Sequence, residues 1–177
     1  MRMLYLALYV GLIIVGLIML LAGVLGIIGM FIPKQHTAQV SFELPTSAPH
    51  AWAIIDDPQS YPEWLSMAER VEILPERNGH TVFRQSQGRN SFILEETVKE
   101  PGRRVVRTIT DDNKLFGGSW DHIVEPIADN RARVTIIESG EIYAAIPRAM
   151  MRLFFGYDHT LKQFQKDLVA HATKAGA

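Results

Sequence analysis

The stretch that decides the fold is IPRAMMRLFFGYDHTLKQFQKDLVAHA, residues 146–172. Apolar residues recur in it at steps of three and four, whereas most charged residues fall on the opposite side. This spacing predicts one amphipathic helix of about seven turns. Its apolar stripe is long and aromatic, so it needs a broad apolar surface to cover it. The stripe consists of Ile146, Met150, Leu153, Phe154, Tyr157, Leu161, Phe164 and Leu168.

The composition excludes several classes of function. The chain has 177 residues, 47% hydrophobic and 21% charged, with a formal net charge of −1. These values predict one folded domain plus an additional segment, and they argue against nucleic-acid binding. No cysteine is present, so disulfides, thiol catalysis and cysteine metal sites are excluded. No cofactor and no metal are expected, because the histidines lack ligand spacing and Asp111–Asn113 is typical of a hairpin turn.

A membrane anchor is expected at the amino-terminal end. The run from Met3 to Ile32 contains no charged residue and consists mainly of Leu, Ile, Val and Gly. As a helix it is about 45 Å long, against a hydrocarbon core of roughly 30 Å. A cleaved signal peptide is the alternative, but its apolar region is only about 7 to 15 residues long. We therefore expect a single-pass membrane helix in residues 1–34 and a folded domain in residues 35–177.

The same run suggests a partner and an orientation. Ala7 with Gly11, and Ala22 with Gly26, are small residues four apart, which lets two membrane helices approach closely. Glycine is also common in membrane helices generally, so the pattern has two explanations. Arg2 precedes the helix and only Lys34 follows closely, a weak bias toward an extracytoplasmic domain. Because almost no linker follows the helix, the domain should lie against the bilayer surface.

In the rest of the chain the sequence pattern predicts one strand, two short helices, six strands and the final helix. Alternation predicts the first strand over 36–44, and Thr46 or Ser47 can cap a short helix that ends near Asp56. A second helical piece follows around 59–65. Glycine, asparagine and proline turns separate six strands at 71–74, 81–87, 91–98, 104–110, 119–126 and 133–142. Successive hairpins make an antiparallel sheet of the α+β class, which only the final helix is large enough to cover.

This element order and four segments resemble the START-related SRPBCC superfamily, and within it the polyketide cyclase/dehydrase and lipid-transport group. The segments are APHAW at 48–52, DPQSYPEW at 57–64, GSW at 118–120 and SGEI at 139–142. The resemblance covers residues 35 to 177 and implies a helix-grip fold, in which a curved antiparallel sheet wraps the carboxy-terminal helix around a hydrophobic cavity. The family uses this cavity for lipids, quinones, polyketides or hormones. It includes transfer proteins, cyclases, hydrolases and receptors, so the fold does not choose the reaction.

His122 is the residue best placed for chemistry. Strand alternation puts Trp120 and His122 on one face, and the same parity turns Glu138 of the next strand toward them. An imidazole and a carboxylate within hydrogen-bonding reach can serve as a general base and its orienting group. Asp121 is an alternative carboxylate for the same reaction, although it faces the other side of the strand. Without a nucleophile or oxyanion donors, however, the pattern favours His122 as a polar group that fixes one end of a ligand, or as a partly exposed strand residue.

Two neighbouring carboxylates are excluded as a paired acid and base. Glu95 and Glu96 follow each other on one predicted strand, so their side chains point to opposite faces of the sheet. The inward member becomes notable only if it meets Arg107 on the next strand.

Aromatic and long apolar side chains are the expected lining of the cavity. Each of them is also explained by ordinary core packing, but the hollow that this fold implies favours a ligand-binding role. The candidate lining consists of Trp64, Phe83, Phe92, Trp120, Met150, Phe154, Tyr157 and Leu161, together with His122 and Glu138 as polar groups.

The first half of the final helix carries a discordant pattern. Met151 and Phe155 project on its polar side beside Arg148 and Arg152, and Gly156 interrupts an otherwise good helix. Apolar residues bracketed by arginines suit contact with lipid headgroups. Burial against a turn or a short helix explains them equally well.

The function expected from these features is membrane-anchored binding or transfer of a small hydrophobic ligand, such as a lipid, a quinone or a polyketide-like molecule. One alternative is a cyclase or hydrolase that uses His122 with Glu138 or Asp121. Another is a structural accessory subunit of a membrane complex, held through the small-residue face of the membrane helix.

Overall fold

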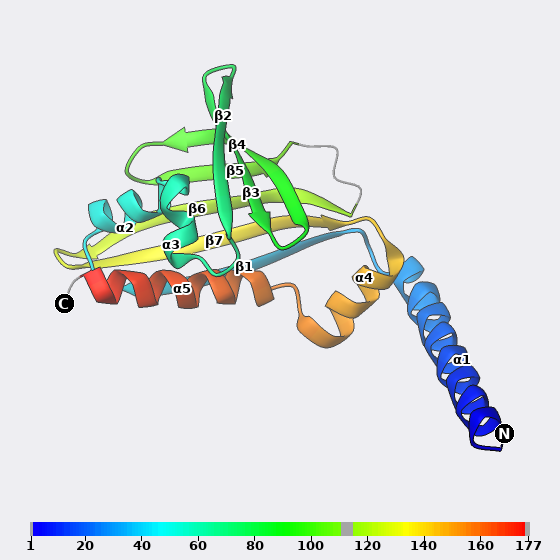
Figure 1. The fold of residues 1–177 in the computed structure, drawn as a ribbon. Coiled ribbons are helices and arrows are strands. Elements are labelled where there is room, and N and C mark those ends of the chain that lie inside the picture. Colours follow the sequence, from blue (N-terminus) through cyan, green and yellow to red (C-terminus); the bar gives the residue numbers. More distant parts are fainter. Residues whose placement is uncertain (1, 111–114, 176–177) are drawn as a thin grey trace.

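The chain consists of one long helix that projects away from a curved sheet, with further helices beside the sheet (Figure 1). The computed structural model describes residues 2–110 and 115–175. The turn expected at Asp111–Asn113 lies outside the described residues. The projecting helix is α1 (Arg2–Phe31), and its side chains are almost all exposed.

Seven strands form a single antiparallel sheet in the order β1-β7-β6-β5-β4-β3-β2. From β2 to β7 each strand pairs with the next one in the chain, whereas β1 pairs with β7 at one edge. Asn78 and Gly79 both have positive φ angles, 54° and 80°, as a tight hairpin turn requires. The predicted strands are confirmed with shifted ends: β1 (Gln35–Leu44), β2 (Arg70–Arg77), β3 (His80–Gln87), β4 (Asn90–Glu100), β5 (Arg104–Ile109), β6 (Phe116–Ala128) and β7 (Arg131–Ile142).

Short helices connect β1 to β2. Ser47 is the N-cap of α2 (Ala48–Ile55), and its side chain accepts a hydrogen bond from the backbone N–H of His50 at 3.4 Å. A short 3-10 turn, η1 (Pro58–Ser60), and α3 (Tyr61–Trp64) follow. These elements confirm the predicted pair of small helices.

The final segment is not one continuous helix, and this part of the prediction was wrong. It consists of α4 (Ala145–Met150), a π-helical turn η2 (Met151–Phe155), and α5 (His159–Ala175). Gly156 separates η2 from α5. Its φ of 76° and ψ of 156° form a conformation that residues with a side chain avoid. Apolar residues continue at helical spacing across this break, but the backbone does not remain helical there.

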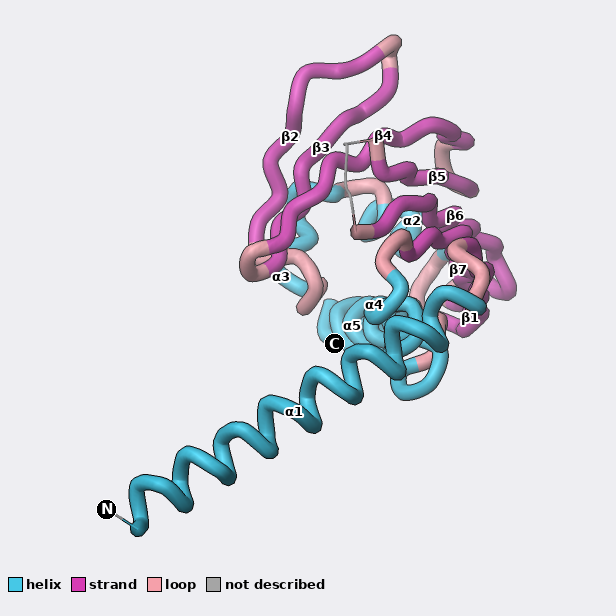
Figure 2. The backbone as a smooth tube through the Cα atoms, turned by 90° about the vertical axis from the view of Figure 1, so that its right-hand side faces the viewer, coloured by secondary structure: helices cyan, strands magenta, loops and turns pink. Residues whose placement is uncertain are grey.

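Helix α5 packs along the inner face of the sheet, and residues of α2 join the same core. The buried α5 residues Leu161, Phe164, Leu168 and Ala172 belong to the main hydrophobic core, together with Val134 and Ile136 of β7 and Val124 of β6. Figure 2 shows the strands curling around this helix. The second half of the predicted stripe is therefore confirmed as the core of a helix-grip fold.

The other half, α4, packs against the end of α1 (Figure 1). A Cβ atom on Gly29 would collide with the carbonyl oxygen of Ala145, so glycine permits this close approach. Gly26 lies next to α4 as well, because a Cβ there would be 3.8 Å from Cγ1 of Ile146. The small-residue face near Gly26 is thus partly covered by the same chain, whereas Ala7 and Gly11 are exposed.

By length and composition α1 is able to cross a membrane, and only 6% of its most apolar window is buried. A signal sequence near the amino terminus would meet the same criteria.

Candidate functional site

The inner face of the sheet carries the side chains singled out in β6. Trp120 and His122 face inward as predicted, and Asp121 faces outward. There the carboxylate of Asp121 accepts hydrogen bonds from Nε of Arg104 at 2.9 Å and from Nη2 at 2.7 Å. Asp121 therefore cannot assist His122, because strand alternation places the two side chains on opposite faces.

His122 is buried and neutral. Its ring packs against the ring of Phe164 in α5, with the two centroids 5.3 Å apart, and the residue is only 4% exposed. Burial, followed by the nearby positive charge of Arg107, lowers the pKa of His122 from 6.5 to about 3. Its Nδ1 atom has no hydrogen-bond partner of good geometry among the described residues, while weaker contacts with the backbone of Val105 and of Trp120 act against this lowering of the pKa. A general base works best with a pKa near the operating pH, so this imidazole is poorly suited to proton abstraction.

Glu138 is buried and binds three other side chains. Its Oε2 accepts hydrogen bonds from Nε1 of Trp120 and from Oγ1 of Thr160, both at 3.0 Å. Its Oε1 lies 3.2 Å from Nε2 of His36. The β6–β7 register sets Trp120 opposite Glu138 and sets His122 two residues away. The expected pairing of His122 with Glu138 was therefore wrong, since the register gives the carboxylate different donors.

His36 is the functional candidate that the sequence reasoning missed. Its ring stacks on Tyr157 with centroids 4.1 Å apart and an interplanar angle of 16°. A Cβ atom on Gly140 would collide with this ring, so the glycine opposite makes room for it. His36 has no metal-ligand spacing to the other histidines, so a search for metal sites in the sequence does not find it. Its alternation with Ala38 in β1 was the signal that places it on the inner face.

A buried ion pair lies deeper on the same face. Nη2 of Arg107 in β5 lies 2.9 Å from Oε1 of Glu96 in β4, and both side chains are 2% exposed. Arg107 also donates to the carbonyl oxygen of Ile55 at 2.8 Å and to the hydroxyl of Tyr61. Its guanidinium lies 5.7 Å from the ring centroid of Phe83. Burial raises the pKa of Tyr61 to about 12, so the hydroxyl stays protonated. Glu96 is thus the inward carboxylate that meets Arg107. The hydrogen bonds from Arg107 to Ile55 and Tyr61 fix α2 and α3 to the strands.

The remaining interior aromatic candidates also lie inside the fold. Trp64 packs edge-on against Phe164 with ring centroids 5.4 Å apart, and its Nε1 is buried without a hydrogen-bond partner among the described residues. Phe92 packs edge-on against Phe116 at 5.9 Å. Leu161 is only 2% exposed and belongs to the core. Phe164 therefore packs against two rings, Trp64 and His122, that each carry a polar atom without a hydrogen-bond partner among the described residues.

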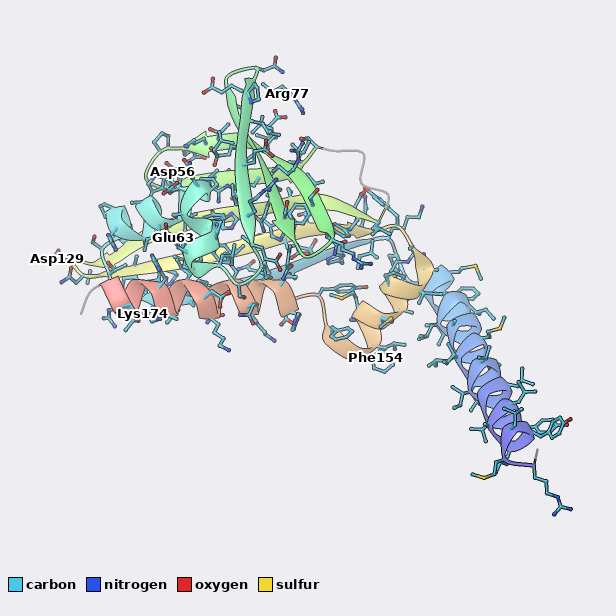
Figure 3. The ribbon with its side chains drawn as sticks, in the orientation of Figure 1. Asp56, Glu63, Arg77, Asp129, Phe154 and Lys174 are labelled. Carbon is cyan, nitrogen blue, oxygen red and sulfur yellow. The ribbon has the colours of Figure 1, made fainter. Side chains whose placement is uncertain are left out.

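Two of the residues expected to line the cavity are exposed on the surface instead. Met150 is 39% exposed and Phe154 is 68% exposed. Figure 3 shows Phe154 on the turn between α4 and α5, away from the sheet. Their assignment to a cavity wall was wrong because the break at Gly156 carries the first half of the stripe off the sheet.

The four residues expected to contact the membrane differ in exposure. Phe155 is 52% exposed, Arg152 is exposed and Met151 is half-buried. Arg148 is only 5% exposed, and its Nε donates to the carbonyl oxygen of Gly29 at 3.0 Å. The expectation that Arg148 lies on an open polar face was therefore wrong.

Two of the hollows that the described residues line are notable for their position. An open apolar groove of about 540 Å³ runs between α1 and α4, and it is lined by Gly23, Gly26, Ile27, Met30 and residues 144–147. A smaller hollow of about 170 Å³ lies over β1 and β7, around Gly140. Within residues 2–110 and 115–175, no three histidine or acidic side chains are grouped as a metal site would need.

A curved antiparallel sheet around α5, with an aromatic inner face, defines a helix-grip protein of the START type. Residues 44–161 match the family described as polyketide cyclase / dehydrase and lipid transport, and the chain belongs to this family. No curated protein matches its sequence.

Several solved structures share the fold. The Zhui aromatase/cyclase of Streptomyces sp. R1128 has a TM-score of 0.70 at 14% identity, covering 81% of this chain and 96% of that chain. A START superfamily protein of Mycobacterium smegmatis has a TM-score of 0.67 at 18% identity, covering 79% and 99%. A norcoclaurine synthase mutant of Thalictrum flavum has a TM-score of 0.62 at 11% identity, covering 81% and 97%. At these identities the likeness shows the fold and not the reaction.

Proposed function

We propose that the protein binds a small hydrophobic molecule on the inner face of its sheet, and that it takes this molecule from or delivers it to an adjacent bilayer. The observation that carries the proposal is the unpartnered Nδ1 of His122, a buried polar atom among aromatic side chains. A buried polar group without a partner costs about 1 to 3 kcal/mol. A ligand that bonds to it would remove this cost, while its apolar part gains roughly 25 cal/mol per Å² removed from water.

The polar groups available favour a ligand with an uncharged polar end. His122 is neutral because its pKa is lowered to about 3, and Trp64 offers an indole N–H, which is neutral as well. Arg107 is already paired with Glu96 and does not offer a free charge. Glu138 already accepts hydrogen bonds from neighbouring side chains. A carbonyl or hydroxyl group, as in a quinone, an isoprenoid alcohol or a polyketide, therefore fits better than a carboxylate or a phosphate.

The anchor completes the proposal. Residues 1–34 would hold the chain in the membrane as a single-pass helix, and residues 35–177 would form the binding domain. The apolar character and exposure of α1 support this assignment. The weak charge bias of Arg2 against Lys34 favours the extracytoplasmic side for the domain.

The two rival functions have less support. A cyclase or hydrolase built on His122 would need a carboxylate partner, and neither Glu138 nor Asp121 bonds to it. A structural accessory role would be favoured by a small-residue packing face and by an interior filled with the protein's own side chains; Gly26 is next to α4 of the same chain, whereas Ala7 and Gly11 remain exposed.

Mass spectrometry of the detergent-extracted full chain tests the proposal. We expect an apolar molecule to co-purify at near-stoichiometric amounts. We also expect an added quinone or isoprenoid alcohol to raise the melting temperature more than a fatty acid of equal length does. If nothing apolar co-purifies and none of these compounds raises the melting temperature, the binding function is rejected.

Two conservative variants connect the result to the site. Trp64→Phe keeps an aromatic ring but removes the N–H donor, and His122→Phe keeps a ring but removes both nitrogens. Each should reduce the ligand-induced rise in melting temperature, whereas His50→Ala on the exposed side of α2 should not. Equal shifts in all three variants would show that the ligand binds elsewhere.

A further inference from the structure

The geometry points to a bilayer-docking ridge on the segment from α4 to η2, whose apolar side chains enter the headgroup–acyl boundary of the membrane that holds α1. The ridge consists of Ile146, Met150, Leu153, Phe154 and Phe155. The inference rests on the membrane anchor of the proposed function, but it makes a separate claim about how the domain lies on the lipid.

The ridge side chains are exposed although they are large and apolar. Ile146 and Met150 are each 39% exposed, Leu153 and Phe155 are each 52% exposed, and Phe154 is 68% exposed. Five large exposed apolar side chains within ten residues of chain are unfavourable in water and mark a surface that meets a partner or a membrane. In a single amphipathic helix all of these residues except Phe155 would have faced the sheet, but the break at Gly156 separates them from the part of the segment that packs on the sheet.

The position of the ridge identifies the partner as lipid. Arg148 bonds to the carbonyl oxygen of Gly29, and the backbone N–H of Ile142 donates to the carbonyl oxygen of Lys34 at 2.9 Å. Strand β1 begins at Gln35, only a few residues after α1 ends. The α4 end of the ridge is therefore held beside the last turns of α1, and η2 continues directly from it. If α1 crosses a bilayer, its end lies at the interface, and the ridge lies in the same layer.

The groove between α1 and α4 continues this apolar surface. It has a volume of about 540 Å³ and its lining is almost entirely apolar. One wall belongs to α1, whose large side chains outside the groove are exposed as expected for contact with hydrocarbon. Lipid acyl chains that surround α1 would fill the groove and would reach the ridge without crossing water.

Charge supports a membrane surface over a second protein. Residues 142–157 contain Arg148 and Arg152 but no aspartate or glutamate. Arg148 is buried in the junction, whereas Arg152 is exposed beside the ridge. An exposed cation next to aromatic and aliphatic side chains is the combination that lies at the headgroup level of anionic bilayers.

The ridge also brings the inner face close to the bilayer. Tyr157 follows Phe155 by two residues and stacks on His36, which contacts Glu138 on the inner side of the sheet. A docked ridge would thus place this end of the sheet beside the lipid, where a hydrophobic ligand is dissolved.

Site-directed spin labelling in the full chain tests the inference, since a chain without native cysteine can be labelled at one chosen position. The positions are Phe154→Cys on the ridge, Leu12→Cys on α1 and Asp129→Cys at the turn between β6 and β7. The protein is placed in vesicles that contain phosphatidylcholine and phosphatidylglycerol. Accessibility of each label to oxygen, which concentrates in lipid, and to a water-soluble nickel chelate is then measured.

We expect the label at position 154 to collide with oxygen and to be shielded from nickel, as the label at position 12 is. The label at position 129 should show the opposite behaviour. If position 12 is lipid-exposed and position 154 is accessible to nickel, the anchor stands and the docking ridge is rejected. If position 12 is itself accessible to nickel, the membrane anchor is rejected. Shielding of position 154 from both reagents would indicate a protein partner and would also reject lipid docking.

A charge variant provides an independent check. Phe154→Asp combined with Phe155→Asp should make a label at Leu153→Cys accessible to nickel, because two carboxylates oppose insertion among anionic lipids. Ile127→Asp, an exposed apolar position on β6, should leave that label shielded. Unchanged melting temperatures would show that both variants are folded, and an unchanged nickel accessibility in the double variant would overturn the inference.

Discussion

Arg148 holds the last turn of α1 across 119 residues of sequence: its Nε donates to the carbonyl oxygen of Gly29 at 3.0 Å. Its Nη1 donates to the carbonyl oxygen of Ile142 at the end of β7, at 3.3 Å. The final carbonyl groups of a helix have no partner within the helix, and a cation there is stabilising. One buried side chain therefore joins the long apolar helix, the sheet and α4.

Replacement of this side chain should loosen the junction. Arg148→Met removes both hydrogen bonds, and we expect the free energy of unfolding to fall by about 2 kcal/mol, the usual value for bonds to a charged group. The measurement is thermal unfolding of the full chain in detergent. Arg152→Met is the matched control, because Arg152 is exposed, and it should change the free energy by less than about 0.5 kcal/mol. Equal effects of the two variants would contradict the role given to Arg148.

Two glycines of α1 should respond differently to the same added methyl group. In Gly29→Ala the new Cβ meets the backbone carbonyl of Ala145, which has little room to move, so α4 must shift. We expect a loss of about 1 to 3 kcal/mol, as for overpacking. In Gly26→Ala the nearest atom is a side-chain carbon 3.8 Å away, an ordinary contact, so stability should be nearly unchanged. The comparison uses melting temperatures in the same detergent, and a destabilised Gly26→Ala would argue against this packing.

Adjacent carboxylates in β4 make a third comparison. Glu96→Gln leaves the guanidinium of Arg107 buried without its counter-ion, and we expect a loss of about 3 kcal/mol. Glu95 pairs at 3.2 Å with Arg77, whose side chain is 50% exposed, so Glu95→Gln should cost less than about 1 kcal/mol. Denaturant unfolding of both variants gives the two free energies. A small effect at Glu96 would mean that water replaces the ion pair.

The buried imidazole predicts a pH dependence. Burial holds the pKa of folded His122 near 3, whereas the unfolded chain binds the proton below about pH 6.5. Between these values only the unfolded state is protonated at this residue. The contribution of His122 to the free energy of unfolding is therefore fully present above about pH 6.5. Between about pH 6.5 and pH 3 it falls by about 1.4 kcal/mol for each pH unit of acidification.

His122→Gln should remove that slope, and His50→Gln, on an exposed histidine, should retain it. Denaturant midpoints between pH 4 and pH 7 measure the difference. A variant of His122 with the same slope as the parent chain would assign the pH dependence to other groups.

Local alternation predicted much of the inner face correctly. Trp120, His122 and Glu138 all face inward, because successive residues of a strand point to opposite sides whatever surrounds them. The same rule would have placed His36 inside. The partners were less predictable. Which donor reaches Glu138 depends on the β6–β7 register and on where α5 begins, and a strand pattern contains neither fact.

The sequence by itself determined the long apolar helix, the seven strands, the helix that grips them and the family. The helices and strands follow from composition, from turn residues or from a repeat along the chain, whereas the family follows from the resemblance of segments such as DPQSYPEW at 57–64. Only the tertiary structure decided that the last segment divides at Gly156, that Arg148 is buried under α1, and that Phe154 faces outward. The physical reason is that helical spacing shows which residues share a face but not which surface that face meets. That choice depends on contacts such as Gly29 with Ala145, between residues far apart in sequence.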